Sequence, residues 1–324
     1  MTRIAVLDDW QKLARQYADW APLKARADVT FFDAPLGDAD AVVDALADYD
    51  IVLSLQDRTK LPATVIERLP KLKMIGITVA NNALDMEACA KHGIIVSKTD
   101  GPLGQGTWAA AELTLGLLIS AFRNFPDAFA NMKLGKFQEG LPVGRTLAGR
   151  TLGVIGFGRL GKRVAEYAIA LGMQVIAWSP HLDRDVAAGS GVKAVSKDDV
   201  LRQADAISVH VKLSETSRGL IGVREIALMK PGALLINTSR GPIVDEAALL
   251  TALGEGRIRA ALDVFDDEPL PPDHPLRSIP NTTLTPHLGF VVEESWARYY
   301  PQSVENALAF LDGHPLRTIV PTGA

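Results

Sequence analysis

The sequence contains very little cysteine. Cys89 is the only one among 324 residues, so no disulfide can form within the chain and no group of thiolates can hold zinc. Cys89 lies in the helical pattern of residues 85–90, which predicts a packed side chain. We therefore exclude a disulfide-stabilised fold and a cysteine-ligated zinc enzyme, and we expect no metal site.

An excess of positive charge is also missing. Lys and Arg number 34 against 38 Asp and Glu, which gives a net charge of −4, and no stretch of the chain concentrates basic residues. Binding to nucleic acid needs clustered Lys and Arg to neutralise phosphates. We therefore expect no nucleic-acid partner.

Long apolar runs are absent as well. The longest, residues 113–122, reaches about half of the roughly 20 residues that cross a bilayer. The N-terminus enters a strand-like run at once and then becomes acidic, which does not fit a signal peptide. We expect no membrane association and a location in the reducing cytoplasm.

What the chain does have is a steady alternation of short β-rich runs and helical stretches. This alternation predicts an α/β protein built from parallel sheets, and the length suits two domains. Helices are expected at residues 39–47, 64–69, 108–124 and 293–311, among others. Strands are expected at residues 3–7, 29–32, 51–55, 74–77 and 94–96, and in a second series at 151–155, 174–178, 192–195, 206–209, 233–237, 259–263 and 283–284.

The most informative segment combines a strand, a glycine-rich turn and a helix. An apolar run ending at Ile155 leads into Gly156-x-Gly158-x-x-Gly161 and then into a helical pattern over residues 162–171. In this context Gly156 permits a tight turn, Gly158 lets backbone approach a pyrophosphate, and Gly161 lets the helix pack on the strand. The start of the helix favours phosphate charge. The segment therefore predicts a bound dinucleotide.

Polar residues follow four more strands of the second series, at the sheet edge where ligands bind in open α/β folds. Ser179 stands where a carboxylate usually holds the adenine ribose, and no Asp or Glu follows until Asp183. A carboxylate there would repel a 2′-phosphate. Its absence leaves the choice between NAD(H) and NADP(H) open.

Three of these strand ends carry candidate reactive groups. Arg240 has a guanidinium suited to a substrate carboxylate. Glu268 lies in an acidic loop after Asp263, where a solvated charge is the competing interpretation. His287 follows the last strand, and a strand-end imidazole beside a carboxylate suits proton exchange near neutral pH.

The four motifs, in this order, resemble the D-isomer-specific 2-hydroxyacid dehydrogenases over nearly the whole chain. They are Gly156-x-Gly158-x-x-Gly161, Thr238-Ser239-Arg240-Gly241, Asp263-Val-Phe-x-x-Glu268-Pro269 and Thr285-Pro286-His287-x-Gly289. The resemblance implies a Rossmann dinucleotide-binding domain, residues 104–287, inserted into a flavodoxin-like substrate domain, residues 1–103 plus 288–324. It also implies a homodimer built on the helix at residues 108–124.

The resemblance further implies hydride transfer between nicotinamide and C2 of a 2-hydroxy or 2-oxo acid. Arg240 would hold the substrate carboxylate, His287 would exchange the proton, and Glu268 would orient His287. Val79, Ala80 and Asn81 would also meet the substrate, although this segment departs from the Gly-rich run of many relatives, and Trp108 is a candidate pocket wall. The residues expected around NAD(H) or NADP(H) are Gly156, Gly158, Arg159, Leu160, Gly161, Ser179, His210, Val211, Thr238, Ser239, Asp263 and Gly289, with Asp263 at the nicotinamide carboxamide.

Two alternatives stay open. One is an NAD(H)-sensing binding protein of the same fold, comparable to corepressors, which needs the glycine turn but no turnover. The other is a dehydrogenase of this fold with an unusual donor such as formate or phosphite. The presence of Arg240, Glu268 and His287 together favours an enzyme acting on 2-oxo acids, glyoxylate and hydroxypyruvate among them.

Overall fold

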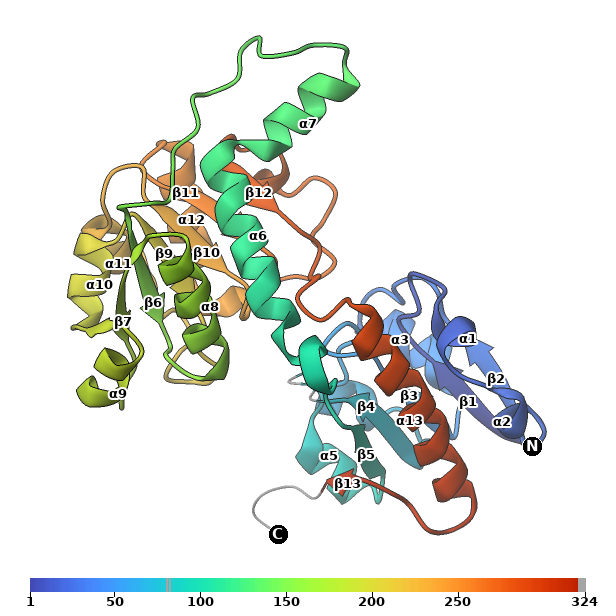
Figure 1. Ribbon diagram of the computed structural model, residues 1–324. Helices are drawn as coiled ribbons and strands as arrows, with labels where there is room; N and C mark the ends of the chain where they lie inside the picture. Colours follow the sequence, from blue (N-terminus) through green and yellow to red (C-terminus); the bar gives the residue numbers. More distant parts are fainter. Residues whose placement is uncertain (80, 82, 320–324) are drawn as a thin grey trace. The chain divides into compact units, whose positions relative to one another are not determined.

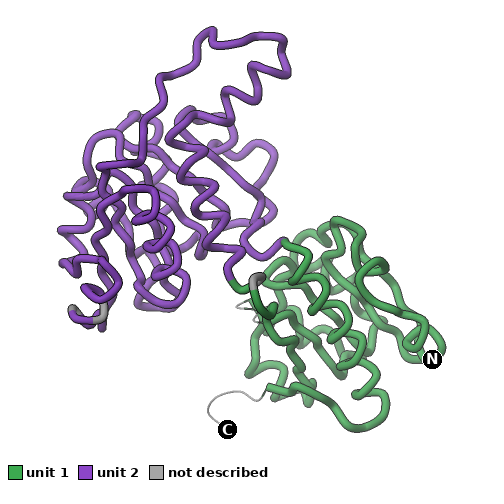
Figure 2. Tube along the Cα trace, viewed as in Figure 1, with its two compact units in different colours: residues 1–107, 292–324 green, residues 108–291 purple. Residues whose placement is uncertain are grey.

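The structure is a computed structural model that describes residues 1–79, 81 and 83–319. The chain forms two compact units, which Figure 2 distinguishes by colour. Unit 1 comprises Met1–Thr107 and Val292–Ala324, and unit 2 comprises Trp108–Val291. Unit 2 is thus inserted into unit 1, and both crossings lie slightly later in the chain than residues 103 and 287.

Unit 1 is built around a largely parallel sheet. Its strand order, β2-β1-β3-β4-β5-β13, contains the flavodoxin-like order 2-1-3-4-5, with an antiparallel β13 added at the edge. The expected fold of this part of the chain is therefore confirmed. The described strands are β1 (Thr2–Val6), β2 (Ala27–Phe31), β3 (Ile51–Leu53), β4 (Met74–Thr78), β5 (Ile95–Thr99) and β13 (Thr318–Ile319).

Helices cover this sheet (Figure 1), and acidic side chains mark where two of them begin. Asp38 accepts a hydrogen bond from the amide of Ala41 at 3.0 Å, and Asp85 accepts one from Ala88 at 2.8 Å, which satisfies amides that the first turn leaves unpaired. The last helix contacts β4 and β5. The helices of unit 1 are α1 (Ala14–Tyr17), α2 (Ala21–Lys24), α3 (Ala39–Leu46), α4 (Ala63–Ile66), α5 (Met86–Lys91) and α13 (Glu293–Leu311).

Cys89 lies on the inner side of α5. Its side chain is 1% exposed among apolar neighbours that include Val65, Ile75 and Leu84. Burial raises the pKa of this thiol to about 12. The thiolate form that reacts with electrophiles and metals is therefore almost absent at neutral pH.

Unit 2 is built around a parallel sheet in the order β8-β7-β6-β9-β10-β11-β12. The first six positions reproduce the doubly wound order 3-2-1-4-5-6 of dinucleotide-binding domains, with β12 added at the edge. The expected Rossmann fold is therefore confirmed. The described strands are β6 (Thr151–Ile155), β7 (Gln174–Trp178), β8 (Lys193–Ala194), β9 (Ala206–Val209), β10 (Leu234–Asn237), β11 (Arg259–Leu262) and β12 (Thr282–Leu284).

Both faces of this sheet are buried, because alternate strand residues point to opposite sides. Ile207 and Leu235 belong to the core on one face, together with residues of α10, α11 and α12, while Val154 and Ile236 belong to the other core with α6 and α8. The helices of unit 2 are α6 (Ala109–Arg123), α7 (Phe125–Lys133), α8 (Arg159–Ala170), α9 (Arg184–Gly189), α10 (Lys197–Gln203), α11 (Val223–Leu228) and α12 (Glu246–Gly254), and shorter 3-10 turns are η1 (Gly104–Trp108), η2 (Gly241–Ile243) and η3 (Pro275–Arg277).

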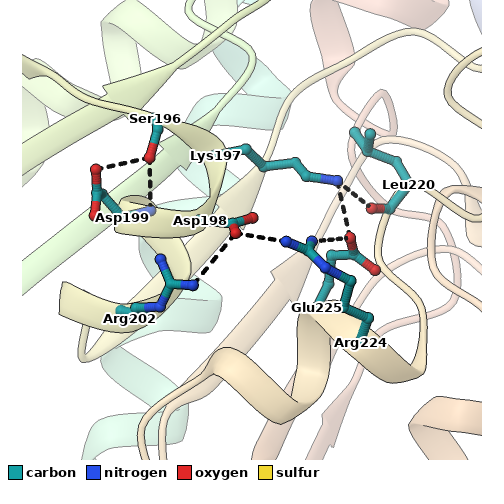
Figure 3. Close-up of polar contacts among 8 residues, drawn as sticks. All are labelled: Ser196, Lys197, Asp198, Asp199, Arg202, Leu220, Arg224 and Glu225. Carbon is teal, nitrogen blue, oxygen red and sulfur yellow. Dashed lines mark hydrogen bonds and ion pairs between the residues drawn. The ribbon is translucent and has the colours of Figure 1, made fainter.

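A network of charged side chains joins α10 to α11 (Figure 3). Lys197 pairs with Glu225 at 3.1 Å, and Arg224 contacts both Glu225 at 2.9 Å and Asp198 at 2.5 Å. Desolvation by burial opposes ionisation of Glu225, but its hydrogen bonds to Lys197, Arg224 and the amide of Gly222 outweigh it and lower its pKa to about 2. The carboxylate is therefore ionised throughout the neutral range.

Helix α7 has no counterpart among the helices expected from the sequence. Asn124 ends α6 in the left-handed conformation, with φ of 53°, and Pro126 lies at the start of the next helix. None of the residues 125–133, all of which the structure describes, is buried. In Figure 1, α7 and the loop after it extend away from the rest of unit 2. We call residues 125–146 the arm.

Candidate active site

The glycine turn after β6 owes its shape to two close approaches. A Cβ on Gly156, which has φ of +97°, would lie 2.6 Å from the carbonyl of His210, and a Cβ on Gly161 would lie 2.1 Å from the Gly156 oxygen. Both positions therefore exclude any side chain. At Gly158, by contrast, an added Cβ would meet no described atom within 4 Å. Gly158 leaves space in front of α8, whereas its two neighbours in the motif serve packing.

The start of α8 suits an anion. Gly158 is the N-cap of this 12-residue helix, and the described first turn contains neither an acidic residue nor a side-chain cap. Its amides and the helix dipole therefore face the space beside Gly158. The residues present fit the pyrophosphate of a dinucleotide, with backbone rather than side chains as the main donors.

Two arginines of α8 stack on an aromatic ring. The guanidinium of Arg163 lies 4.0 Å from the centre of the Trp108 ring, and that of Arg159 lies 5.4 Å from it. Leu160 packs against the core beneath. Within unit 2, Trp108 thus acts as a platform that holds the first turns of α8.

The end of β7 has no carboxylate at its first position. The Ser179 carbonyl accepts the amide of Leu182 at 3.1 Å, and the first acidic side chain, Asp183, is exposed and accepts the amide of Asp185 at 2.8 Å. The choice between NAD(H) and NADP(H) stays open.

His210 and Val211 form the wall behind the glycine turn. The His210 amide donates to the Ile155 carbonyl at 2.7 Å, and its Nε2 lies 2.8 Å from the Ser208 hydroxyl. Burial lowers the pKa of His210 to about 4, so the ring is neutral at physiological pH. A side-chain methyl of Val211 lies against Gly156.

A buried asparagine shapes the turn that carries Arg240. The Asn237 amide donates to the Arg240 carbonyl at 2.8 Å and accepts the Ser239 amide at 3.0 Å. The Ser239 hydroxyl donates to the Val209 carbonyl at 2.9 Å, and the Arg240 guanidinium donates to the Ser239 carbonyl at 2.7 Å. The Arg240 guanidinium thus contacts the backbone of its own turn.

Gly241 brings this turn against the loop that follows β11. A Cβ on Gly241 would lie 2.2 Å from the carbonyl carbon of Phe265 and 2.5 Å from the amide of Asp266. Only glycine allows the two backbones to approach so closely. The Arg240 turn and the Glu268 loop are thus fixed relative to each other by direct contact.

Glu268 and His287 are brought together. Oε1 of Glu268 accepts the Phe265 amide at 2.9 Å, and Oε2 lies 2.5 Å from Nδ1 of His287. The two side chains are 20% and 16% exposed. Because the carboxylate engages Nδ1, Nε2 is the nitrogen left to exchange a proton with another molecule.

Asp263 organises the backbone that carries His287. Its fully buried carboxylate accepts hydrogen bonds from the Thr285 hydroxyl at 2.6 Å and from the amides of Leu288 and Gly289 at 2.7 and 2.9 Å. Burial raises the pKa of Asp263, although these bonds oppose the shift. His287 has φ of 53°, an uncommon conformation for a residue with a side chain, and the bonds on either side of it hold that conformation.

Sequence reasoning missed one polar contact at this edge. The hydroxyl of Thr114, in α6, lies 2.8 Å from the hydroxyl of Thr238. Thr114 is fully buried, and in the sequence it looks like one more residue on the packed face of an apolar helix. A polar residue among apolar neighbours was the only available signal.

The segment expected to meet the substrate in unit 1 follows β4. Val79 has φ of 58°, and its amide lies 3.3 Å from the Thr99 hydroxyl. The Asn81 side-chain oxygen accepts the amide of Ala83 at 2.8 Å. Ala80 lies outside the described residues.

Asp8 is a second unusual group in unit 1. It follows β1, has φ of 63° and is buried. Its carboxylate accepts the Thr59 hydroxyl at 2.8 Å, and its carbonyl accepts Arg58 at 2.9 Å. Burial outweighs these favourable contacts and raises the pKa of Asp8 to about 6.

The structure thus combines a fold typical of dinucleotide-binding proteins with a histidine paired to a carboxylate. A family model described as "D-isomer specific 2-hydroxyacid dehydrogenase, NAD binding domain" matches residues 115–289. The chain belongs to this family. It therefore uses a nicotinamide dinucleotide, and NAD(H) and NADP(H) are both compatible with that assignment.

Relatives and solved structures agree with the family. The chain is 41% identical to D-3-phosphoglycerate dehydrogenase of Methanocaldococcus jannaschii, over 79% of this chain and 48% of that protein. It is 37% identical to glyoxylate reductase of Aeropyrum pernix, over 78% of each. A phosphoglycerate oxidoreductase of Vibrio cholerae has a similar structure, with a TM-score of 0.89 at 32% identity, covering 97% of this chain and all of that one. The chain spans about half the length of the curated D-3-phosphoglycerate dehydrogenases that it matches.

The described residues contain no group of three or more His, Cys, Asp or Glu side chains arranged to hold a metal ion. They also contain no helix long and apolar enough to cross a membrane.

Proposed function

We propose that the protein is an oxidoreductase that transfers hydride between NAD(H) or NADP(H) and C2 of a 2-oxo or 2-hydroxy acid. The pairing of His287 with Glu268 at 2.5 Å is the observation that carries the proposal. A protein that only senses the dinucleotide needs the glycine turn, but it does not need an imidazole poised for proton exchange. The formate and phosphite alternatives have no specific support among the described residues.

In the direction of reduction, the dinucleotide supplies the hydride. Nε2 of His287 gives a proton to the C2 oxygen as that oxygen gains charge, and Glu268 stabilises the protonated ring through Nδ1. Arg240 binds the substrate carboxylate with its planar guanidinium. Asp263 takes the nicotinamide carboxamide through the acceptor positions that its three hydrogen bonds leave unused.

The names of the relatives suggest the acids to try. Glyoxylate and D-3-phosphoglycerate follow from those names, and hydroxypyruvate follows from the resemblance described in the sequence analysis. We propose these three as first candidates, with Val79, Ala80 and Asn81 contributing to the choice between them. The test is nicotinamide absorbance with NADH and NADPH supplied separately with each 2-oxo acid, and with NAD and NADP supplied separately for D-3-phosphoglycerate. Turnover with any acid supports the proposal. Tight binding of dinucleotide without turnover on any acid would favour the sensor instead.

The variant His287→Gln tests the proton-transfer role. We expect kcat/KM to fall on the order of 10²- to 10⁴-fold, the usual contribution of a general acid, while the dissociation constant of the dinucleotide changes little. His314→Gln is the matched control, because His314 is exposed and has no proposed role. Near-normal turnover by the His287 variant would contradict the assignment.

We further propose that the protein is a cytoplasmic homodimer. The arm exposes apolar side chains that a monomer would normally bury, including Phe129 at 62%, Phe137 at 68% and Val143 at 95%, and such patches mark interaction sites. The arm continues directly from α6, the helix expected at the interface. A second copy of the chain is the partner that the family resemblance implies.

Sedimentation of a double variant, Phe129→Glu with Phe137→Glu, tests the dimer. We expect the mass in solution to fall to that of one chain. Lys136→Glu is the control, because it changes charge on the same arm without removing apolar area. An unchanged mass for the double variant would exclude this surface as the interface.

A further inference from the structure

The buried face of α6 contains one hydroxyl that connects the helix to the candidate active site. Thr114 is fully buried, and its neighbours on this face include Ala111, Leu117 and Leu118. Its Oγ1 lies 2.8 Å from the carbonyl oxygen of Ala110 and 2.8 Å from Oγ1 of Thr238. Thr238 follows β10, so the contact joins a core helix to the turn that carries Arg240.

The two distances determine where both hydroxyl protons lie. Two oxygen atoms that approach within 2.8 Å need a proton between them. A carbonyl has no proton, so Thr114 must donate to Ala110. The proton between the two hydroxyls must then come from Thr238. The hydrogen bonds therefore run in one direction, from Thr238 to Thr114 to the Ala110 carbonyl.

Because Thr238 donates its one hydroxyl proton to Thr114, it can only accept a hydrogen bond from another molecule. Thr238 is partly exposed, and it is adjacent to Asp263 across the sheet, because Asn237 pairs with Leu262 and the Asp263 amide donates to the Asn237 carbonyl at 3.0 Å. Asp263 is likewise an acceptor. Asp263 is fully buried, so Thr238 is the accessible acceptor of the two, and it favours a ligand that donates hydrogen bonds.

The start of α6 also touches the loop that Asp263 holds. A Cβ on Gly289 would lie 3.5 Å from the Ala110 side chain and 3.2 Å from the Asp263 carboxylate. Ala110 thus supplies both the carbonyl that ends the hydrogen-bond chain and a surface against Gly289. The position of Thr114 is fixed relative to Thr238 and to Asp263.

We infer that Thr114 is a positioning residue that fixes the Thr238 hydroxyl as a hydrogen-bond acceptor for the amide N–H of the nicotinamide carboxamide. The inference rests on the dinucleotide binding in the proposed function. A carboxamide N–H is a donor that suits Thr238, the partly exposed acceptor at this edge. Thr114 itself does not touch the dinucleotide.

The variant Thr114→Val removes the acceptor and nearly preserves the shape of the side chain. The Thr238 proton then lacks an internal partner and competes with the carboxamide donor. We expect the dissociation constant of the reduced dinucleotide to rise about tenfold, the equivalent of one hydrogen bond. The 3-acetylpyridine analogue of the same dinucleotide has a methyl group in place of the amide nitrogen, so its dissociation constant should not change.

Fluorescence titration of the full chain measures both constants without any turnover. Thr114→Ser keeps the hydroxyl and should behave as wild type. Thr251→Val is the matched control. The Thr251 hydroxyl donates to the Ala247 carbonyl at 2.9 Å on the exposed side of α12. This contact resembles the one between Thr114 and the Ala110 carbonyl, but it lies on another helix and does not involve Thr238. This variant should bind both dinucleotides as wild type does.

Equal weakening of both dinucleotides by Thr114→Val would assign Thr114 a purely structural role and overturn the inference, as would no weakening of either. If that variant does not fold, Thr238→Val removes the hydroxyl that is proposed to accept the carboxamide N–H and leaves α6 intact. It should lower the preference for the natural dinucleotide over the analogue about tenfold, the equivalent of one hydrogen bond, and an unchanged preference would overturn the inference. A wild-type protein that binds with this pattern but reduces no 2-oxo acid would refute the proposed function alone.

Discussion

The contact between the Arg240 turn and the Glu268 loop can be tested by a single methyl group. In Gly241→Ala, the new Cβ would lie 2.2 Å from the Phe265 carbonyl carbon and 2.3 Å from its oxygen. Carbon atoms that do not bond normally stay about 3.5 Å apart. Backbone lies on both sides of the contact, so no flexible side chain can move aside, and the two loops must separate by about 1 Å.

When groups that take part in a reaction are displaced by about 1 Å, the rate falls on the order of 10²-fold. We expect kcat/KM for the preferred acid to fall by that factor, because Arg240 would no longer lie correctly relative to Glu268 and His287. Overpacking of this kind also costs about 1–3 kcal/mol of stability. The glycine turn after β6 lies on other elements, so the affinity for the adenine half of the dinucleotide should not change.

The assay combines steady-state kinetics with thermal unfolding. Gly254→Ala is the matched control, since an added Cβ at the exposed end of α12 meets no described atom within 4 Å. This control should keep full activity and equal or slightly higher stability. A folded Gly241→Ala protein with activity within about threefold of wild type would refute the reasoning, because a shift large enough to relieve the clash would then be harmless.

Three further predictions concern charge. Arg240→Lys should lower kcat/KM at least about 10²-fold, because a point charge cannot replace a two-pronged contact, and stopped-flow reduction of the preferred acid measures it. Glu225→Gln should destabilise the protein by about 2 kcal/mol at pH 7 in urea unfolding; the folded pKa is depressed, so the difference should shrink as the pH falls from 4.5 towards 2. Asp8→Asn should change stability in the opposite direction. The folded pKa of Asp8 is raised from 3.8 to about 6, so the variant should be more stable than wild type by about 3 kcal/mol at pH 7 and should lose this advantage below about pH 4.

Much of the fold could be predicted because the strands are short apolar runs separated by turns. The run before Gly156, for example, is apolar on both faces, as expected for a central parallel strand. The helix after it began earlier than expected, at Arg159 rather than residue 162, because glycine and arginine in the first turn give no apolar stripe. The helix α7 was not predicted because Asn124 and Pro126, at its start, are residues that indicate the end of a helix in a sequence.

The candidate active site could likewise be predicted only in part. The order of the motifs pointed to Arg240, Glu268 and His287, because strand ends on one sheet edge can be read from the sequence. The hydrogen bonds of Asp263 could not be predicted, since they depend on how the loop after β12 folds back over β11. The Thr114 contact depends on the packing of α6 against β10, which no local pattern records.

Cys89 has a practical consequence. A chain with one thiol that is 1% exposed and has a pKa of about 12 is already close to a cysteine-free background. A new cysteine on the arm or on α8 could carry a spectroscopic label without removal of the native residue. Cys89 itself becomes reactive only when α5 separates from the sheet, so the rate of its modification reports the free energy of opening that part of unit 1. Cys89 modification therefore measures local unfolding of unit 1 without any engineered probe.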